Sequence, residues 1–206
     1  PGEEGGIFYS PRNWSKISAT RIVMGHEISV TALQVLSMMS AIAYNGVQMK
    51  PMLIRKVTAP DGTVLKEFEA EVLGRPLSAA CARRMRRLLA RVTEEGGTAT
   101  EAAVEGYRVG GKTGTAQKIR PQADGGGYYD KNFTSSFVGF LPVENPEIAI
   151  IVVADDPGEY NEKGKKSNYY GGTVCGPAFS EIAGFAVRYL RIPPEGEVVY
   201  IARPDK

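Results

Sequence analysis

The sequence predicts an α+β fold in which helices flank an antiparallel sheet. Two apolar, strand-like segments, 133–141 and 148–154, are joined by a short connection that contains prolines. Such a short connection is typical of adjacent antiparallel strands. Helical patterns at 32–44, 78–92 and 173–190 lie before and after these strands. Helices on both sides of a run of strands favour a mixed fold with the helices packed on the sheet.

Composition is consistent with one globular unit. The chain has 206 residues, a length sufficient for a sizeable core. Its content of 43% apolar and 23% charged residues is ordinary for a globular protein. Its longest apolar run, 148–154, is far shorter than the roughly 20 residues needed to cross a bilayer. A net charge of +2 gives no argument for a nucleic-acid partner. Because the chain opens on Pro-Gly-Glu-Glu, we expect a piece of a longer protein whose membrane anchor lies upstream.

The first half of the chain contains one strong helix and one hairpin. Residues 1–14 are rich in glycine and proline and read as a loop. Thr31 and Gln34 form a T-x-x-Q capping box, which predicts a helix start. The following residues are apolar nearly all round, so we expect this helix to be buried on every side. Further on, a Pro-Asp-Gly turn between 52–57 and 63–68 predicts a hairpin.

The next helix, 78–92, is predicted to place its arginines in solvent. Its apolar residues recur at spacings of three and four, and Arg83, Arg84, Arg86 and Arg87 lie on the other side. The predicted buried face consists of Leu77, Cys81, Met85, Leu88, Leu89 and Val92. Two cysteines are too few for a disulfide framework, and we expect both to be small core residues.

The last predicted elements surround a turn and a closing helix. Asp155 and Asp156 precede Pro-Gly, which favours a strand-ending turn over a metal site. The segment 120–132 has a proline and three glycines and is predicted to be a loop. The closing helix, 173–190, is predicted to bury one face, made of Val174, Phe179, Ile182, Phe185 and Ala186.

One segment fits two functional patterns with different chemistry. Residues 106–113, GYRVGGKT, match the phosphate-loop pattern G-x-x-x-x-G-K-[ST], and 112–115, KTGT, match a signature of penicillin-binding enzymes. A phosphate loop needs a buried strand before it and a helix beginning at its Lys-Thr. The preceding segment, 98–105, is no apolar strand, and Gly114 and Pro121 disfavour a helix after it. Both flanks therefore argue against nucleotide binding.

On an extended edge strand, 112–118, the same residues suit a peptide. Side chains alternate along a strand, so Lys112 and Gly114 face one way and Thr113 and Thr115 the other, unless the edge twists. Lys112 supplies positive charge and the threonines supply hydrogen bonds for a carboxylate, while Gly114 permits close approach of another backbone. A peptide could add to the edge as an extra strand, and the Thr115 amide could point at a developing oxyanion.

The surrounding residues carry a specific resemblance. From residue 14 to residue 192 the chain resembles the C-terminal part of the transpeptidase domain of class B penicillin-binding proteins. The segments that carry it, in the family's order, are GHEISVTALQ (25–34), AYNG (43–46), GY (106–107), GKTGTAQK (111–118), SFVGFLP (136–142), YYGG (169–172) and PAF (177–179). His26 and Glu27 depart from the usual Gln and Gly of the first segment, which puts the local backbone there in question.

The resemblance implies a penicillin-binding, β-lactamase-like fold and a serine-type D,D-transpeptidase that cross-links peptidoglycan. It implies that Lys112, Thr113, Gly114 and Thr115 bind the carboxylate of the terminal D-alanine or of a β-lactam, with the Thr115 amide in the oxyanion hole. No metal or organic cofactor is implied. Implied partners are the stem peptide, β-lactams and proteins of cell division or elongation and cell shape, on the periplasmic side of the membrane. The alternative is a non-catalytic penicillin- or peptide-binding sensor.

Two motifs of the family are missing from this sequence. No serine is followed by lysine at the third place or by asparagine at the second, so the S-x-x-K and S-x-N motifs are expected upstream of Pro1. We therefore expect the domain to be incomplete at the N-terminus, with 1–192 its C-terminal portion and 193–206 a tail. Alone, the chain is expected to form no acyl-enzyme. The outer edge of strand 148–154 is expected to be bare and to cause poor solubility or a dimer.

Overall fold

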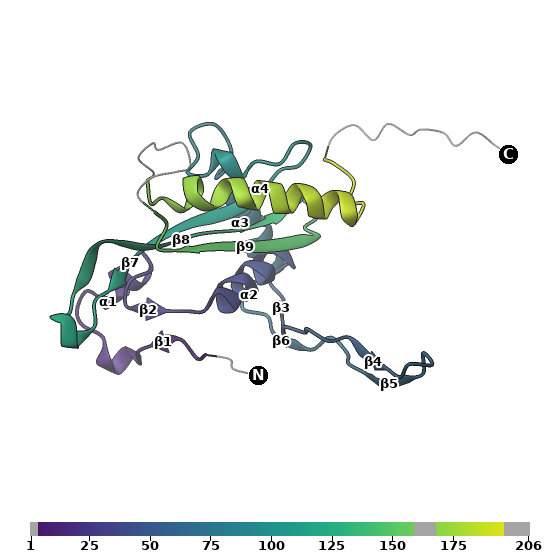
Figure 1. Ribbon diagram of the computed structural model, residues 1–206, viewed down its shortest axis with the longest axis horizontal. Helices are drawn as coiled ribbons and strands as arrows, with labels where there is room; N and C mark the ends of the chain where they lie inside the picture. The colour runs from purple at the N-terminus through teal and green to yellow at the C-terminus, as the bar shows by residue number, and fades with distance from the viewer. Residues whose placement is uncertain (1–3, 159–167, 196–206) are drawn as a thin grey trace.

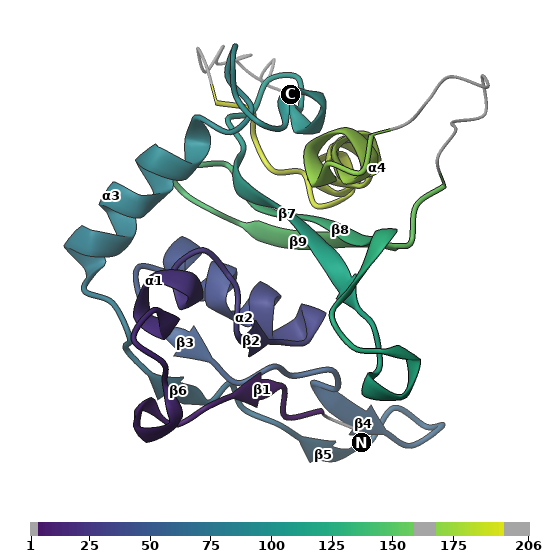
Figure 2. The same ribbon diagram turned by 90° about the vertical axis from the view of Figure 1, so that its left-hand side faces the viewer.

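A three-stranded antiparallel sheet is the centre of the protein. The structure, a computed structural model, describes residues 4–158 and 168–195. The sheet contains β7 (Gly110–Ile119), β8 (Tyr128–Leu141) and β9 (Ile148–Asp155), in the order β7-β8-β9. Helix α4 (Gly171–Tyr189) covers one face, and α2 (Ala32–Ala43) and α3 (Ala79–Ala90) cover the other (Figures 1 and 2). The predicted α+β class with an antiparallel sheet is confirmed.

Strand β8 is the middle of this arrangement and is buried on both faces. Its side chains alternate, so Phe137 packs against Phe179 of α4, with ring centroids 4.7 Å apart, while Val138 and Phe140 pack under α2 and α3. Phe137 and Phe140 are fully buried. Gly111 of β7 lies opposite Gly139, and a Cβ at Gly111 would lie 2.6 Å from the Phe137 ring. Glycine at position 111 therefore leaves the space that the Phe137 ring occupies.

Helix α2 starts as predicted but is not buried on every side. Gln34 N donates to Thr31 Oγ1 at 3.2 Å and Thr31 N donates to Gln34 Oε1 at 2.9 Å, so the capping box is confirmed. Met39 and Ile42 are buried against the sheet and α3, whereas Leu33 and Met38 are 45% and 54% exposed. The prediction of complete burial is wrong because, among the described residues, α2 is packed from one side only.

Helix α3 exposes Arg83, Arg84 and Arg87 as predicted, but not Arg86. Arg86 is only 5% exposed, and its Nη1 donates to Ala43 O at 3.1 Å and to Asn45 Oδ1 at 3.0 Å. The last carbonyls of a helix lack intrahelical donors, and this guanidinium supplies one to the end of α2. Burial lowers the pKa of Arg86 from its usual value. Leu88 and Cys81 are exposed, so the predicted buried face is wrong at these two positions, whereas Val92 is buried and Met85 and Leu89 pack against the core.

Helix α4 buries only part of its predicted face: Phe179 is buried and Val174 packs against the same core cluster. Cys175, Phe179, Ala183 and Val187 recur every fourth residue and are buried against the sheet. Ile182 and Phe185 were expected on that face but are 49% and 63% exposed. Cys175 is a core residue as predicted, and burial raises the pKa of its thiol.

Smaller elements complete the chain. The predicted hairpin is confirmed as β4 (Lys56–Thr58) paired with β5 (Val64–Glu67), and it projects away from the sheet (Figure 1). The predicted loop 120–132 is shorter, because β8 begins at Tyr128. No helix within the described ranges is long and apolar enough to span a membrane. The other elements are β1 (Ile7–Phe8), η1 (Pro11–Asn13), α1 (Ser18–Ile22), β2 (Ile28–Ser29), β3 (Gln48–Met49), β6 (Val72–Gly74), η2 (Thr100–Ala102) and η3 (Gln122–Asp124).

Candidate functional site

The KTGT segment lies within β7, an outer strand of the sheet, as predicted. Lys112 is paired with Val138 and Thr115 with Ser135, so the segment is extended throughout. Lys112 is exposed, and its Nζ donates to Thr113 O at 2.8 Å. A phosphate loop requires a helix that begins at the Lys-Thr, and here both residues are in a strand. The geometry therefore contradicts the phosphate-loop alternative.

The two threonine hydroxyls face helix α4, opposite to Lys112. Thr115 Oγ1 accepts a hydrogen bond from the Gly171 amide at 3.1 Å, at the first residue of α4. Because an amide can only donate, the Thr115 proton remains available for another acceptor. Thr113 Oγ1 lies 3.4 Å from Thr98 Oγ1. Two hydroxyls and a helix N-terminus thus meet along one stretch of the edge strand.

Glycine at position 114 is explained by the protein itself. A Cβ on Gly114 would lie 2.4 Å from Ser136 Oγ, on the neighbouring strand. Gly171 is equally confined, since its Cβ would lie 2.4 Å from Gly114 O and 2.1 Å from Ser136 O. The N-terminus of α4 can therefore approach the KTGT backbone only because Gly171 has no side chain. The expectation that Gly114 admits a ligand backbone stays a prediction.

Polar side chains join the three strands of the sheet where β7 and β9 end. Lys118 Nζ lies 2.9 Å from Asp155 Oδ1, and Asn132 Nδ2 donates to Asp156 Oδ2 at 2.6 Å. The hydrogen bond from Lys118 lowers the pKa of Asp155 and raises the pKa of Lys118. Asp156 follows β9 with a left-handed backbone, φ 55°, which agrees with the predicted turn. Both carboxylates thus bind side chains of the other two strands.

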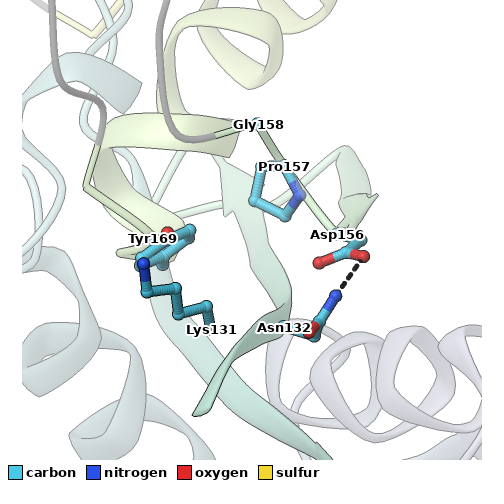
Figure 3. Close-up of a pocket in the computed structure, with 6 residues that line it drawn as sticks. All are labelled: Lys131, Asn132, Asp156, Pro157, Gly158 and Tyr169. Carbon is cyan, nitrogen blue, oxygen red and sulfur yellow. Dashed lines mark hydrogen bonds between the residues drawn. The ribbon is translucent and has the colours of Figure 1, made fainter. Parts of the chain in front are cut away.

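A shallow pocket of about 260 Å³ lies beyond the end of β9 (Figure 3). The Asn132–Asp156 hydrogen bond crosses one side of it. None of the four KTGT residues lines it, so within the described residues the candidate site is an open strand edge rather than this hollow. The residues that line the pocket are Lys131, Asn132, Asp156, Pro157, Gly158 and Tyr169.

The departure at His26 and Glu27 has a structural counterpart. Glu27 adopts φ 59°, a conformation that favours glycine, so the backbone keeps the shape that the usual Gly would allow. Its carboxylate accepts from Arg21 Nη1 at 3.2 Å, and a hydrogen bond with Ser18 lowers its pKa. His26 is exposed, and its amide donates to Arg21 O at 3.0 Å. The local turn is thus held by Arg21 from two directions.

Sequence reasoning missed Thr98 and Gly171 as neighbours of the KTGT segment. Both are distant along the chain and come together only because α4 packs on the sheet. A signal was present for Gly171, since a Gly-Gly pair at a helix start disfavours helix formation and calls for a packing reason. Thr98 has no comparable signal, because a single threonine after glycines is ordinary in a loop.

The chain is similar in sequence to known proteins. The sequence profile described as the penicillin binding protein transpeptidase domain matches residues 1–184. The chain is 33% identical over 195 residues to a probable peptidoglycan D,D-transpeptidase PenA of Neisseria gonorrhoeae, covering 94% of this chain and 30% of that protein. It is 31% identical over 195 residues to the peptidoglycan D,D-transpeptidase FtsI of Escherichia coli, with 94% and 29% covered. The chain therefore spans about three tenths of the curated relatives that it matches.

Solved structures of penicillin-binding proteins have the same fold. The transpeptidase domain of Burkholderia pseudomallei penicillin-binding protein 3 superposes with a TM-score of 0.77 at 34% identity, covering 96% of this chain and 54% of that one. Penicillin-binding protein 3 of Mycobacterium tuberculosis, complexed with ampicillin, gives a TM-score of 0.81 at 31% identity, with 97% and 43% covered. With a sequence profile over 1–184 and relatives above 30% identity, the chain belongs to the penicillin-binding protein transpeptidase domain family.

Proposed function

We propose that this chain is the substrate-carboxylate part of a serine D,D-transpeptidase that cross-links peptidoglycan and binds β-lactams. The observation that carries the proposal is the edge of β7, which has a lysine on one face and, on the other, two hydroxyls beside the start of α4. Positive charge and hydroxyl donors suit a peptide carboxylate. The relatives named D,D-transpeptidases, and the solved relative that binds ampicillin, support the same chemistry.

Each residue of the segment has a proposed role. Lys112 attracts the carboxylate, and Thr113 and Thr115 donate to it through their hydroxyls. The amide of Thr115 stabilises the oxyanion of the tetrahedral intermediate, an effect commonly worth about 3 kcal/mol. Lys112 Nζ donates to the Thr113 carbonyl. This contact supports a Thr113 whose backbone N–H and C=O point away from β8. Since alternate residues of an edge strand point the same way, Thr115 would also present its amide outward.

The reaction is acyl transfer in two steps. A serine oxygen attacks the carbonyl of the D-Ala–D-Ala bond, the peptide C–N bond breaks, and D-alanine leaves with a proton. The amine of a second stem peptide then attacks the ester, which forms the cross-link and returns the proton to the serine. No serine in this sequence has the S-x-x-K setting. The nucleophile and its base are therefore proposed to come from residues of the parent protein outside this sequence.

Further parts of the proposal concern boundaries and setting. Residues 1–192 are proposed as the domain portion; Tyr107 OH donates to Ile192 O at 2.6 Å, and the Glu195 carboxylate accepts from the Arg108 amide at 2.7 Å. Of the proposed tail, 196–206 lies outside the described residues. The site is proposed to work on the extracytoplasmic side of the membrane, in division or elongation, because that is where peptidoglycan is cross-linked.

The proposal is tested by intact-mass measurement of the full-length protein with penicillin. We expect one covalent adduct, formed at least tenfold more slowly when Lys112 becomes alanine, since a charged hydrogen bond to the carboxylate is lost. Lys56→Ala, on the remote β4–β5 hairpin, is the matched control and should react like the wild type. An adduct without cross-linking of peptides would favour the sensor alternative. No adduct with any β-lactam would refute the proposal.

A further inference from the structure

Lys118 is the last residue of the GKTGTAQK segment, and the proposed function gives it no role. Strand β7 pairs with β8 residue by residue from Gly110 to Gln117, and the register then shifts between Gln117 and Ile119. Lys118 is the residue at this irregularity. A bulge increases local twist and redirects a side chain, and bulges are frequent beside active sites. The irregularity lies three residues after Thr115, which is about 10 Å along a strand.

The Lys118 side chain connects the two outer strands of the sheet. Its Nζ lies 2.9 Å from Asp155 Oδ1 on β9, although β8 separates β7 from β9. Thr134 of β8 lies opposite Asp155 and donates its hydroxyl to the same carboxylate oxygen at 3.3 Å. All three strands are therefore joined at one carboxylate. The contact lowers the pKa of Asp155 and raises the pKa of Lys118, so it favours the charged form of both groups.

The β9 side of this contact is fixed independently of β7. The amide of Asp156, next to Asp155, donates to Phe133 O at 2.8 Å, and its carboxylate accepts from Asn132 at 2.6 Å (Figure 3). Asp155 itself is in register with Thr134. The end of β9 is thus bound to β8 by backbone and side-chain contacts. A β7 side chain that binds Asp155 is tied to a part of the sheet that does not depend on β7.

Strand β7 is the outer strand that carries the proposed ligand-binding residues. Among the described strands it has one partner, β8, so its outer side is free for a ligand. An oxyanion or carboxylate site must hold its donors within about 0.5 Å of the productive geometry. We propose that Lys118 is a positioning residue, whose ion pair with Asp155 clamps the end of β7 and fixes the Thr115 segment for catalysis. This inference rests on the proposed function of β7.

The opposing explanation is an ordinary surface ion pair. The Lys118 and Asp155 side chains are 30% and 72% exposed, and exposed pairs contribute little because water and salt screen them. The chain offers a matched pair in Lys50 and Glu71, which are 2.7 Å apart and each 58% exposed, in a part of the fold away from β7. If ion pairs matter here only as surface charges, the two pairs should behave alike.

The experiment measures acylation of the full-length protein by penicillin and its melting temperature. Lys118→Met and Asp155→Asn should each slow acylation about two- to fivefold, the range open to a partly exposed pair. The loss should lie in the acylation step rather than in initial binding, since the oxyanion contact forms only in the transition state. The double variant should be no slower than either single one. Exchanging the charges, with Lys118→Asp and Asp155→Lys, should restore at least half of the lost rate.

The control and a second readout keep the test decisive. Lys50→Met should lower the melting temperature by a similar amount and leave acylation unchanged. An unchanged rate in Lys118→Met, or an equal slowing in Lys50→Met, would overturn the inference. If the wild type forms no adduct, the proposed function fails, and amide hydrogen exchange decides on the clamp by itself. Exchange along 113–117 should be faster in Lys118→Met than in the wild type, and unchanged exchange would refute the clamp.

Discussion

The two outer strands of the sheet occupy equivalent positions and have opposite character. β7 carries a lysine, hydroxyls and glycines along its middle, whereas β9 is almost wholly apolar. Alternate residues of β9 pack on opposite sides, Ile150 and Val152 toward α4, Ala149 and Ile151 toward α2. Apolar side chains on both faces are typical of a strand inside a larger sheet, while polar residues are typical of an edge that stays open.

This difference shows that an unpaired strand edge can serve either to bind a ligand or to pack against further protein. Within the part of the chain that the structure describes, neither β7 nor β9 has a strand on its outer side. The chemistry of β7 suits a polar peptide that binds and leaves, and the chemistry of β9 suits permanent cover by protein. The solved transpeptidase domain of Burkholderia pseudomallei is nearly twice as long as this chain, so it has residues that can provide such cover.

The largest expected effect tests whether β7 depends on α4 for its shape. Gly171→Ala places a Cβ against the carbonyls of Ser136 and Gly114, so the helix start must move away from the strand. We expect a loss of about 2–3 kcal/mol of unfolding free energy, as for overpacked cores, together with slower acylation. Chemical denaturation measures the first effect. Gly184→Ala is the control, because its Cβ meets only a flexible arginine at 3.6 Å, and it should not destabilise.

The next prediction concerns the apolar edge. The isolated chain should self-associate through β9, and Val153→Lys should weaken that association about tenfold, because a lysine on an edge strand opposes pairing. Val153 is 45% exposed, so the substitution should leave the core intact. Analytical ultracentrifugation measures the association. Ala116→Lys on β7 should have no comparable effect, and a chain that is monomeric at high concentration would contradict the assigned role of β9.

A smaller effect is expected at the contact between β7 and α4. Thr115→Val leaves the Gly171 amide without the acceptor that it has at 3.1 Å. A lost hydrogen bond of this kind costs about 1 kcal/mol, and the hydroxyl is also lost to the substrate carboxylate. Thr115→Ser keeps the oxygen and should retain most of the stability and of the acylation rate. Equal behaviour of the two variants would show that the hydroxyl is not used.

The smallest expected effect is a pH dependence of stability that comes from the ion pair between Lys118 of β7 and Asp155 of β9. Because the pKa of Asp155 is lowered by Lys118, this contribution to stability is present above the unfolded pKa of Asp and is lost as pH falls through the folded value. The pKa of Lys118 is raised, so its contribution to stability is present below the unfolded pKa of Lys and is lost as pH rises through the folded value. Stability should thus differ between wild type and Asp155→Asn across roughly pH 4 to 10 and converge below. Melting curves at stepped pH measure this, and a difference that persists at pH 2 would contradict it.

Local sequence signals predicted where the helices and strands lie, but not which of their faces are buried. The capping box of Thr31 and Gln34 is a contact between neighbours, so it was predictable. The burial of Arg86 on α3 was not, because its acceptor is at the carbonyl end of α2, more than forty residues away. Likewise, Ile182 of α4 is exposed, whereas Phe179 and Ala183 of the same helix are buried. Hydrophobic period locates a helix but does not say what covers each side.

The sequence by itself determined that KTGT is extended, that β8 and β9 are antiparallel neighbours, and that the chain resembles the transpeptidase family. These are consequences of short-range backbone chemistry and of a long ordered match. Only the tertiary structure decided that Gly171 brings the start of α4 against Thr115, and that Lys118 reaches Asp155 across β8. Such contacts join residues far apart in sequence, and they exist because packing helix on sheet fixes distances that no local pattern encodes.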